Sequence, residues 1–221
     1  MTVKQALEKR KSVRAFLDKD VPTELIKELL NQAKLAPSGV NMQPWQICVV
    51  SGAKKRELET TLCQKFDDGI FDEMEYEYYP KVWQEPYKSR RKETGLLMYE
   101  TLGITREDKE RQHEQWKANY RAFDAPVVLL FFIDKHLEAG SYLDYGMFLQ
   151  SFMLAATASG LATCPQAAYA SYAKSIKEAL HVKDDNILLG GIALGYEDEQ
   201  ALVNSYRTTR LKIEDFVRFY E

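Results

Sequence analysis

The sequence predicts an α+β fold with a mixed central sheet and flanking helices. The run V-V-L-L-F-F-I over residues 127–133 has the composition of a central strand that is buried on both faces. Residues 186–196 indicate a second buried strand, and apolar residues between positions 23 and 36 recur at the spacing of an amphipathic helix. Helices and strands alternate unevenly along the chain, which favours the α+β class.

The N-terminal part of the chain is predicted to contain helices on either side of a basic segment. Thr23, next to Pro22, is the expected N-cap of the amphipathic helix. Four elements are predicted here: a helix over residues 2–9, a helix from 23 to 36, a strand over 45–50 and a helix over 53–65.

Residues 66–123 differ from the rest of the chain and are interpreted as an insertion. They hold 11 of the chain's 26 aromatic residues, together with dense charge of both signs. Because a loop of this length without secondary structure is uncommon, we expect helices, of which 107–121 is the clearest. Most of the aromatic side chains are expected to form the core of the insertion, and two or three to face a ligand.

The C-terminal part is predicted to begin with a helix from Ser141, its expected cap, to Ser159, where Gly160 ends it. This helix is apolar on nearly all sides, so it must be covered all round, and a subunit interface would cover it. A helix over 172–181 and the strand over 186–196 follow, and residues 205–221 form a C-terminal segment. We expect residues 1–221 to form a single domain.

Charge, cysteines and histidines argue against several classes of protein. The formal net charge of -3 provides no overall basic field for nucleic acid. Three widely spaced cysteines indicate a reducing compartment, and scattered histidines without a C-x-x-C pair indicate no metal site. The most apolar stretch is interrupted by polar residues, so we expect no membrane-spanning segment. The N-terminus has no signal-peptide pattern, so we expect a cytoplasmic protein.

Motifs of common catalytic classes do not occur in this sequence. It has no G-x-S-x-G, no G-x-G-x-x-G and no P-loop spacing. What remains are arginines, amides and aromatic residues, which suit a flavin: cations for its phosphate, hydrogen-bonding groups for the pyrimidine edge and apolar cover for the flat ring. A flavin would carry hydride acceptance and donation, while the protein supplies position and electrostatics.

The segment K-R-K-S-V-R-A-F, residues 9–16, is a candidate phosphate site. In an extended chain the side chains of Arg10, Ser12 and Arg14 point to one side. Two guanidinium groups and a hydroxyl suit a phosphate, although a solvated basic helix end is the alternative. Arg207 and Arg210 near the other end of the chain could converge on the same anion, or could belong to a solvated tail.

The run A-P-S-G-V-N-M-Q-P-W, residues 36–45, joins a predicted helix to a predicted strand. Ser38, Asn41 and Gln43 bring hydroxyl and amide groups into this loop, and such groups can hydrogen-bond along a flat polar edge. Loops held between regular elements commonly carry binding sites. The alternative is a turn whose residues serve conformation alone.

Taken in order, R-K-S-V-R-A-F and A-P-S-G-V-N-M-Q-P-W resemble the FMN-dependent nitroreductase family, and the C-terminal runs A-S-G-L-A-T, C-P-Q-A, G-G-I-A-L-G-Y and N-S-Y-R-T-T-R agree. The resemblance implies the three-layer nitroreductase fold and a homodimer with FMN at its interface. It also implies that NAD(P)H reduces the FMN by hydride transfer to flavin N5, followed by ping-pong reduction of a nitroaromatic or quinone. No catalytic side chain is assigned, because the flavin carries the chemistry.

The resemblance also assigns the cofactor-binding residues. They are Arg10, Lys11, Ser12 and Arg14 near the phosphate and ribityl chain, Arg207 and Arg210 as a phosphate clamp, Pro37, Ser38, Gly39, Asn41 and Gln43 at the flavin edge of the partner subunit, and Pro165, Gln166 and Ala167 beside the ring. Some family members have an acidic residue and a glycine where this chain has Gln166 and Ala167, so only a backbone role is expected there. Cys164 is expected to be a small buried apolar residue, and the insertion to cover the substrate.

Two other functions are open at this stage. One is a related flavin reaction, either reductive dehalogenation of an aromatic compound or oxygen-dependent breakdown of the flavin. The other is a flavin-binding protein without turnover, which bleaching of the flavin by NAD(P)H would distinguish from an enzyme.

Overall fold

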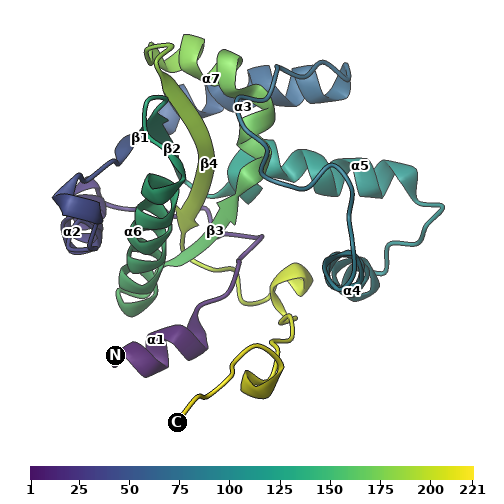
Figure 1. The fold of residues 1–221 in the computed structure, drawn as a ribbon. Coiled ribbons are helices and arrows are strands. Elements are labelled where there is room, and N and C mark those ends of the chain that lie inside the picture. The colour runs from purple at the N-terminus through teal and green to yellow at the C-terminus, as the bar shows by residue number, and fades with distance from the viewer.

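The computed structural model describes residues 1–221 and contains a four-stranded sheet between two helical layers (Figure 1). The strands are β1 (Gln46–Ser51), β2 (Val127–Asp134), β3 (Ala162–Gln166) and β4 (Asn186–Gly195), in the order β1-β2-β4-β3. All three strand pairs are antiparallel, and the parallel component of the sheet is an isolated bridge between Ser12 and Thr163. The predicted α+β class is confirmed, but the predicted mixed sheet is wrong, because all pairs of neighbouring strands are antiparallel.

Strand β2 is the centre of the core, as its apolar sequence predicts. Its residues from Val127 to Ile133 are all buried. Leu129 and Phe131 pack with the layer that contains α2 (Thr23–Ala33) and α6 (Ala139–Ala158), while Leu130 and Phe132 pack with the opposite layer. That opposite layer contains α3 (Gly52–Asp67), α7 (Ala173–Leu180) and the 3-10 helices η2 (Ala118–Asp124) and η3 (Ala167–Tyr172).

Two predicted helix caps are wrong. Thr23 is the first residue of α2 rather than its cap, because Pro22 occupies the capping position and provides no side-chain hydrogen bond. Helix α6 begins at Ala139 after the cap Glu138, three residues before the predicted cap, so Ser141 lies inside the helix and is buried. The predicted end is correct: Gly160, just beyond α6, has φ +77°, a conformation that glycine adopts without steric cost.

Helix α6 is the longest helix and still has exposed apolar side chains. Leu143 is 75% exposed and Met147 is 40% exposed, although other residues of the helix, such as Phe148 and Phe152, are buried against the sheet and α2. Exposed apolar residues clustered on one helix are typical of an interaction surface. No helix in the structure combines the length and the apolar character that crossing a bilayer requires.

The insertion contains α4 (Tyr87–Leu102), α5 (Lys109–Lys117) and η2. The helix predicted over 107–121 is therefore a shorter α-helix continued by 3-10 turns. The expectation that most aromatic side chains form the core of the insertion is wrong. Only Tyr120 and Phe123 are buried, and they pack on the sheet, while five others (Phe71, Tyr78, Tyr79, Tyr87 and Trp116) are more than half exposed. Helix α4 has no buried residue and lies away from the sheet (Figure 1).

Polar contacts fix the start of the insertion to the sheet layer. Asp72 accepts hydrogen bonds from the main-chain nitrogen of Ser175 at 2.7 Å and from Lys65 Nζ at 2.8 Å. Glu75 pairs with Lys177 and accepts a hydrogen bond from the main-chain nitrogen of Leu188 at 3.0 Å. The contacts of Asp72 and Glu75 therefore fix the start of the insertion, from which the chain continues to α4.

Candidate cofactor site

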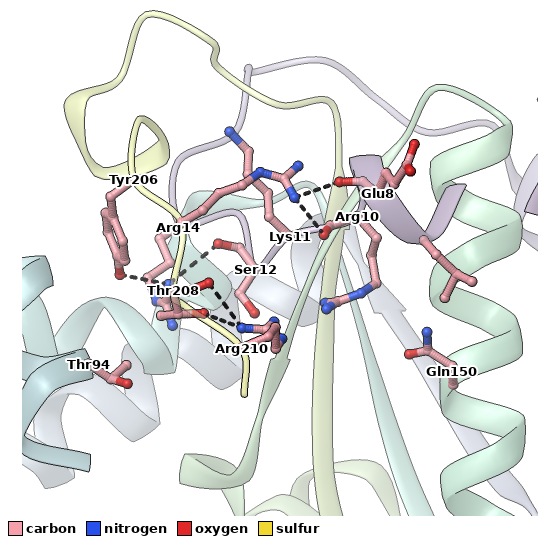
Figure 2. A pocket seen from close by; sticks show the side chains of 12 residues that line it. Glu8, Arg10, Lys11, Ser12, Arg14, Thr94, Gln150, Tyr206, Thr208 and Arg210 are labelled. Atoms are coloured by element: carbon pink, nitrogen blue, oxygen red, sulfur yellow. Dashed lines mark hydrogen bonds between the residues drawn. The ribbon is translucent and has the colours of Figure 1, made fainter. Parts of the chain in front are cut away.

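The two ends of the chain meet at a cavity of about 520 Å³, which we call the arginine cavity (Figure 2). Its lining comes from α1 (Val3–Lys9), the basic segment, α4, α6 and the C-terminal segment. The lining residues are Leu7, Glu8, Arg10, Lys11, Ser12, Arg14, Thr94, Gln150, Tyr206, Arg207, Thr208 and Arg210. All six residues predicted to bind the phosphate and ribityl chain are thus brought together.

The basic segment has an extended backbone that turns alternate side chains toward this cavity. The main-chain nitrogen of Val13 donates a hydrogen bond to the carbonyl oxygen of Thr163 at 3.0 Å, and the Val13 side chain is buried. Because side chains alternate along an extended chain, burial of Val13 leaves Ser12 and Arg14 on the cavity side. Arg10, Ser12 and Arg14 all line the cavity, as the predicted one-sided arrangement requires, and Lys11 lines it as well.

Asn204 and Tyr206, for which the sequence predicts no role, hold the C-terminal segment in place. The Asn204 side chain is buried; its oxygen accepts from the main-chain nitrogen of Arg14 at 2.8 Å and its nitrogen donates to the carbonyl oxygen of Ala15 at 2.8 Å. The Tyr206 hydroxyl accepts a hydrogen bond from Arg14 Nη1 at 3.0 Å. Both residues belong to the run N-S-Y-R-T-T-R. The feature of the sequence that could have pointed to them is an asparagine close to two arginines.

The basic side chains around the cavity are of two kinds: some bind other parts of the protein, and others have no carboxylate partner. Lys11 Nζ forms an ion pair with Glu197 at 2.6 Å, and Arg207 Nη1 donates to the carbonyl oxygen of Glu8 at 2.6 Å, near the end of α1. Such a contact satisfies a carbonyl group that the helix end leaves free. Arg10 and Arg210 instead extend into the middle of the cavity, and neither has a carboxylate partner (Figure 2).

Positive charge is crowded at the centre of the cavity. Burial, followed by the like charges of Arg210 and Arg207, lowers the pKa of the Arg10 guanidinium. A group in this situation is stabilised by a nearby anion, because an opposite charge favours the charged form. The site is therefore suited to an anionic ligand group such as a phosphate.

Cys164 lies on β3 near Arg10, Ser12 and Arg14, and it is buried. Burial raises the pKa of its thiol to about 11, in spite of the nearby charges of Arg14 and Arg10. The thiol therefore stays protonated at neutral pH, which fits the predicted role of a small buried residue.

The predicted ring-side residues lie at the end of β3, which is an edge strand of the sheet. Pro165 is exposed, whereas Gln166 is only 5% exposed and its Nε2 donates to the carbonyl oxygen of Asn119 at 2.7 Å. The Gln166 Oε1 atom is buried without a hydrogen-bond partner. Gly190 allows this packing, because it has φ +142° and a Cβ there would lie 2.6 Å from the carbonyl oxygen of Gln166.

The loop that contains Pro37, Ser38, Gly39, Asn41 and Gln43 lies outside the arginine cavity. Its shape is fixed locally: Ser38 Oγ accepts from the main-chain nitrogen of Gln43 at 3.0 Å, and Asp144 of α6 accepts from that of Gly39 at 3.1 Å. Most of the loop is exposed. Within one chain the structure therefore does not join the two predicted halves of the site, although α6 contacts this loop through Asp144 and the cavity through Gln150.

The sequence profile of the nitroreductase family matches residues 7–196. The chain belongs to the nitroreductase family. It is 39% identical over 210 residues to a 4-nitrobenzoate reductase from Pseudomonas putida, an alignment that covers 95% of this chain and 92% of that protein.

Solved structures of nitroreductases agree with this assignment. The FMN and NADPH-dependent nitroreductase NfnB from sphigopyxis sp. strain HMH superimposes with a TM-score of 0.97 at 36% identity, covering 100% of both chains. FMN-dependent NfnB from Mycobacterium smegmatis, solved in complex with NADPH, gives a TM-score of 0.93 at 33% identity, again over 100% of both chains. The resemblance seen in the sequence motifs is confirmed, while the roles of individual site residues stay predictions.

Proposed function

We propose that the protein is an FMN-dependent oxidoreductase of the cytoplasm that takes electrons from NAD(P)H and passes them to nitroaromatic or quinone-type acceptors. Its membership of the nitroreductase family and its similarity to a 4-nitrobenzoate reductase support this function, and its three free thiols fit a reducing compartment. The observation that carries the proposal is the convergence of Arg10, Arg14 and Arg210 on one cavity.

The arginine cavity fits the phosphate of FMN. A phosphate monoester has about two negative charges at pH 7 and three acceptor oxygens. Arg10 and Arg210 have no carboxylate partner. Arg210 Nη1 donates to Thr208 and Thr209, which leaves its other N–H groups and those of Arg10 to donate to the phosphate oxygens, and Ser12 adds a hydroxyl. Lys11 and Arg207 serve this site indirectly, because they hold Glu197 and α1 around it.

The end of β3 suits the flavin ring. The outer edge of β3 pairs with no further strand beyond the Ser12–Thr163 bridge, so main-chain groups near Pro165 and Ala167 can meet the edge of a flat ligand. The buried oxygen of Gln166 offers an acceptor without a partner. When bound, FMN supplies hydride acceptance and donation, and these residues bind and orient it.

The complete site is proposed to form in a homodimer. The loop that contains Gly39 and Asn41 is exposed and lies outside the arginine cavity, which fits a loop that contacts the flavin of the second copy. Exposed Leu143 and Met147 on α6 provide apolar surface for the interface.

The insertion is proposed to cover the substrate. Its exposed aromatic side chains can stack on flat molecules and exclude water from the flavin. Donor and acceptor would then use one site in turn, giving ping-pong kinetics. A complex that contains NAD(P)H and an acceptor together on one flavin would contradict this scheme.

An absorbance spectrum of the purified protein tests the proposed function. We expect flavin bands that bleach when NADPH or NADH is added without oxygen, and that return when a nitroaromatic is added. Bands that persist with both donors would instead indicate flavin storage. A colourless protein that takes up no added FMN would refute the assignment of the cofactor.

A further inference from the structure

A second cavity of about 550 Å³ adjoins the arginine cavity, and we call it the α4 cavity. It lies between α4 and the C-terminal segment, and its lining includes Arg90, Glu93, Thr208 and Arg210. Thr94, Thr208 and Arg210 line both cavities, so the two are contiguous. Figure 2 shows Thr94 on α4 facing the segment that carries Thr208 and Arg210.

The two cavities together have more positive charge than one phosphate neutralises. Their linings contain five arginines without a carboxylate ion pair (Arg10, Arg14, Arg90, Arg207 and Arg210), and Lys11 is already paired with Glu197. Two glutamates, Glu8 and Glu93, are the acidic lining residues. One phosphate monoester, with about two negative charges, leaves this surface positive. The remaining positive charge favours the binding of a second anionic group.

Arg90 is positioned for that second group by the geometry of α4. The lining residues Arg90, Glu93, Thr94 and Leu97 recur at intervals of three and four, so they share one face of the helix. Arg90 lies in the first turns of α4, where the helix dipole favours an anion. Arg91 lies off this face, and its guanidinium stands 4.9 Å from the centre of the Trp83 ring, whereas that of Arg90 stands 5.7 Å from the centre of the Tyr87 ring.

We propose that Arg90 and Arg210 form a subsite for the 2′-phosphate of NADPH. The inference rests on the proposed function and extends it to the choice of electron donor. A single-ring acceptor has to lie against the flavin ring, whereas the α4 cavity adjoins the residues proposed for the flavin phosphate. A dinucleotide has its 2′-phosphate on the adenosine end, remote from the nicotinamide that must lie against the flavin ring. A second phosphate of the donor therefore fits this position better than an acidic group of the acceptor.

The test uses the FMN-loaded protein and two variants, Arg90→Gln and the matched control Arg91→Gln. Calorimetry measures the binding of adenosine 2′,5′-bisphosphate, and of AMP, which lacks the 2′-phosphate. We expect Arg90→Gln to weaken binding of the bisphosphate about tenfold, the loss that accompanies one charge-assisted hydrogen bond. We expect Arg91→Gln to leave it unchanged, and neither variant to change the binding of AMP.

Anaerobic bleaching of the flavin provides a second readout. In Arg90→Gln the NADPH concentration for half-maximal bleaching rate should rise about tenfold, while that for NADH stays unchanged. Equal binding of the bisphosphate by Arg90→Gln and the wild type would overturn the inference. So would a variant in which the NADPH and NADH concentrations for half-maximal bleaching rise equally, or one in which only the binding of 4-nitrobenzoate is weakened. These outcomes require all three proteins to hold FMN equally. Failure of the wild type to bind FMN would instead refute the proposed function.

Discussion

The side-chain nitrogen of Gln166 donates a hydrogen bond to the main-chain carbonyl oxygen of Asn119, with a nitrogen-to-oxygen distance of 2.7 Å. Gln166 ends β3, the strand proposed to run beside the flavin, and Asn119 lies in η2 at the end of the insertion. The Asn119 side chain in turn donates to the carbonyl oxygen of Trp116 at 2.9 Å, at the end of α5. One buried amide thus links the proposed ring-side strand to the proposed substrate cover.

Replacing Gln166 with glutamate should break this link. A carboxylate has no proton to donate, and its charge would be buried against a carbonyl oxygen, so we expect a loss of about 2–3 kcal/mol in the free energy of unfolding at pH 7. Gln166→Met, which keeps the length of the side chain without a charge, should cost less. Urea denaturation measures both. Because Gln166→Met also lacks the donor, a Gln166→Met variant as stable as the wild type would argue against the hydrogen bond, and equal losses in the two variants would show that the buried charge adds nothing.

Asp72→Asn should loosen the base of the insertion in a pH-dependent way. Burial acts to raise the pKa of the Asp72 carboxyl, but hydrogen bonds from Lys65 and Ser175 lower it below its ordinary value. A carboxyl with a lowered folded pKa stabilises the protein above its unfolded pKa, and this contribution disappears as the pH falls through the folded pKa. We therefore expect a loss of about 1–2 kcal/mol at pH 7 that shrinks below pH ~4.

Limited proteolysis gives a structural check on the same variant. Trypsin should cut after Lys81 faster in Asp72→Asn than in the wild type at pH 7, because the chain beyond residue 77 loses part of its anchor. Unchanged cleavage at Lys81 together with unchanged stability would show that Glu75 and Lys177 suffice to hold this region.

Cys164 should make the protein less stable at high pH. Its thiol has a pKa of about 11 in the folded chain, raised by burial from an ordinary value of 9.0. Between these values the unfolded chain loses the proton first, so stability falls as the pH rises. A shift of this size corresponds to a loss of about 3 kcal/mol once the pH exceeds both values, and about 2 kcal/mol of it falls between pH 8 and 10.5. The drop in stability between pH 8 and 10.5 should be smaller in Cys164→Ala, and identical drops in the two proteins would contradict the assignment.

Leu143→Glu should dissociate the proposed homodimer. Leu143 is 75% exposed on α6, and a charge there would be buried without a partner if α6 forms the interface. Analytical ultracentrifugation should find a dimer for the wild type and a monomer for the variant, with unchanged circular dichroism. A monomeric wild type would refute the proposed interface and leave the loop around Asn41 without its expected contact.

The sequence predicts three of the four strands and the basic cluster because their signals are local. It does not predict β3 (Ala162–Gln166), which is short and contains Pro165. The apolar run of β2 needs no information from other parts of the chain, and alternation alone places Arg10, Ser12 and Arg14 on one side. The two incorrect caps show the limit of this approach. Capping depends on which residue leaves the helical conformation, and the positions of Pro22 and Glu138 decided that.

The partners of individual cations could not be predicted from local patterns. Lys11 pairs with Glu197 and Arg207 caps α1, and both contacts exist only after the two ends of the chain have met. Asn204 is buried for the same reason. The exposed aromatic side chains of the insertion also depend on tertiary structure, because α4 lies away from the sheet and has no buried face.

The central claim is that the arginine cavity binds the phosphate of FMN, and flavin titration tests it most directly. The wild type should bind FMN on the order of a hundredfold more tightly than riboflavin, which lacks the phosphate. Arg10→Gln should remove much of this difference by weakening FMN alone, while Arg91→Gln preserves it. Equal affinities of the wild type for FMN and riboflavin would contradict the account.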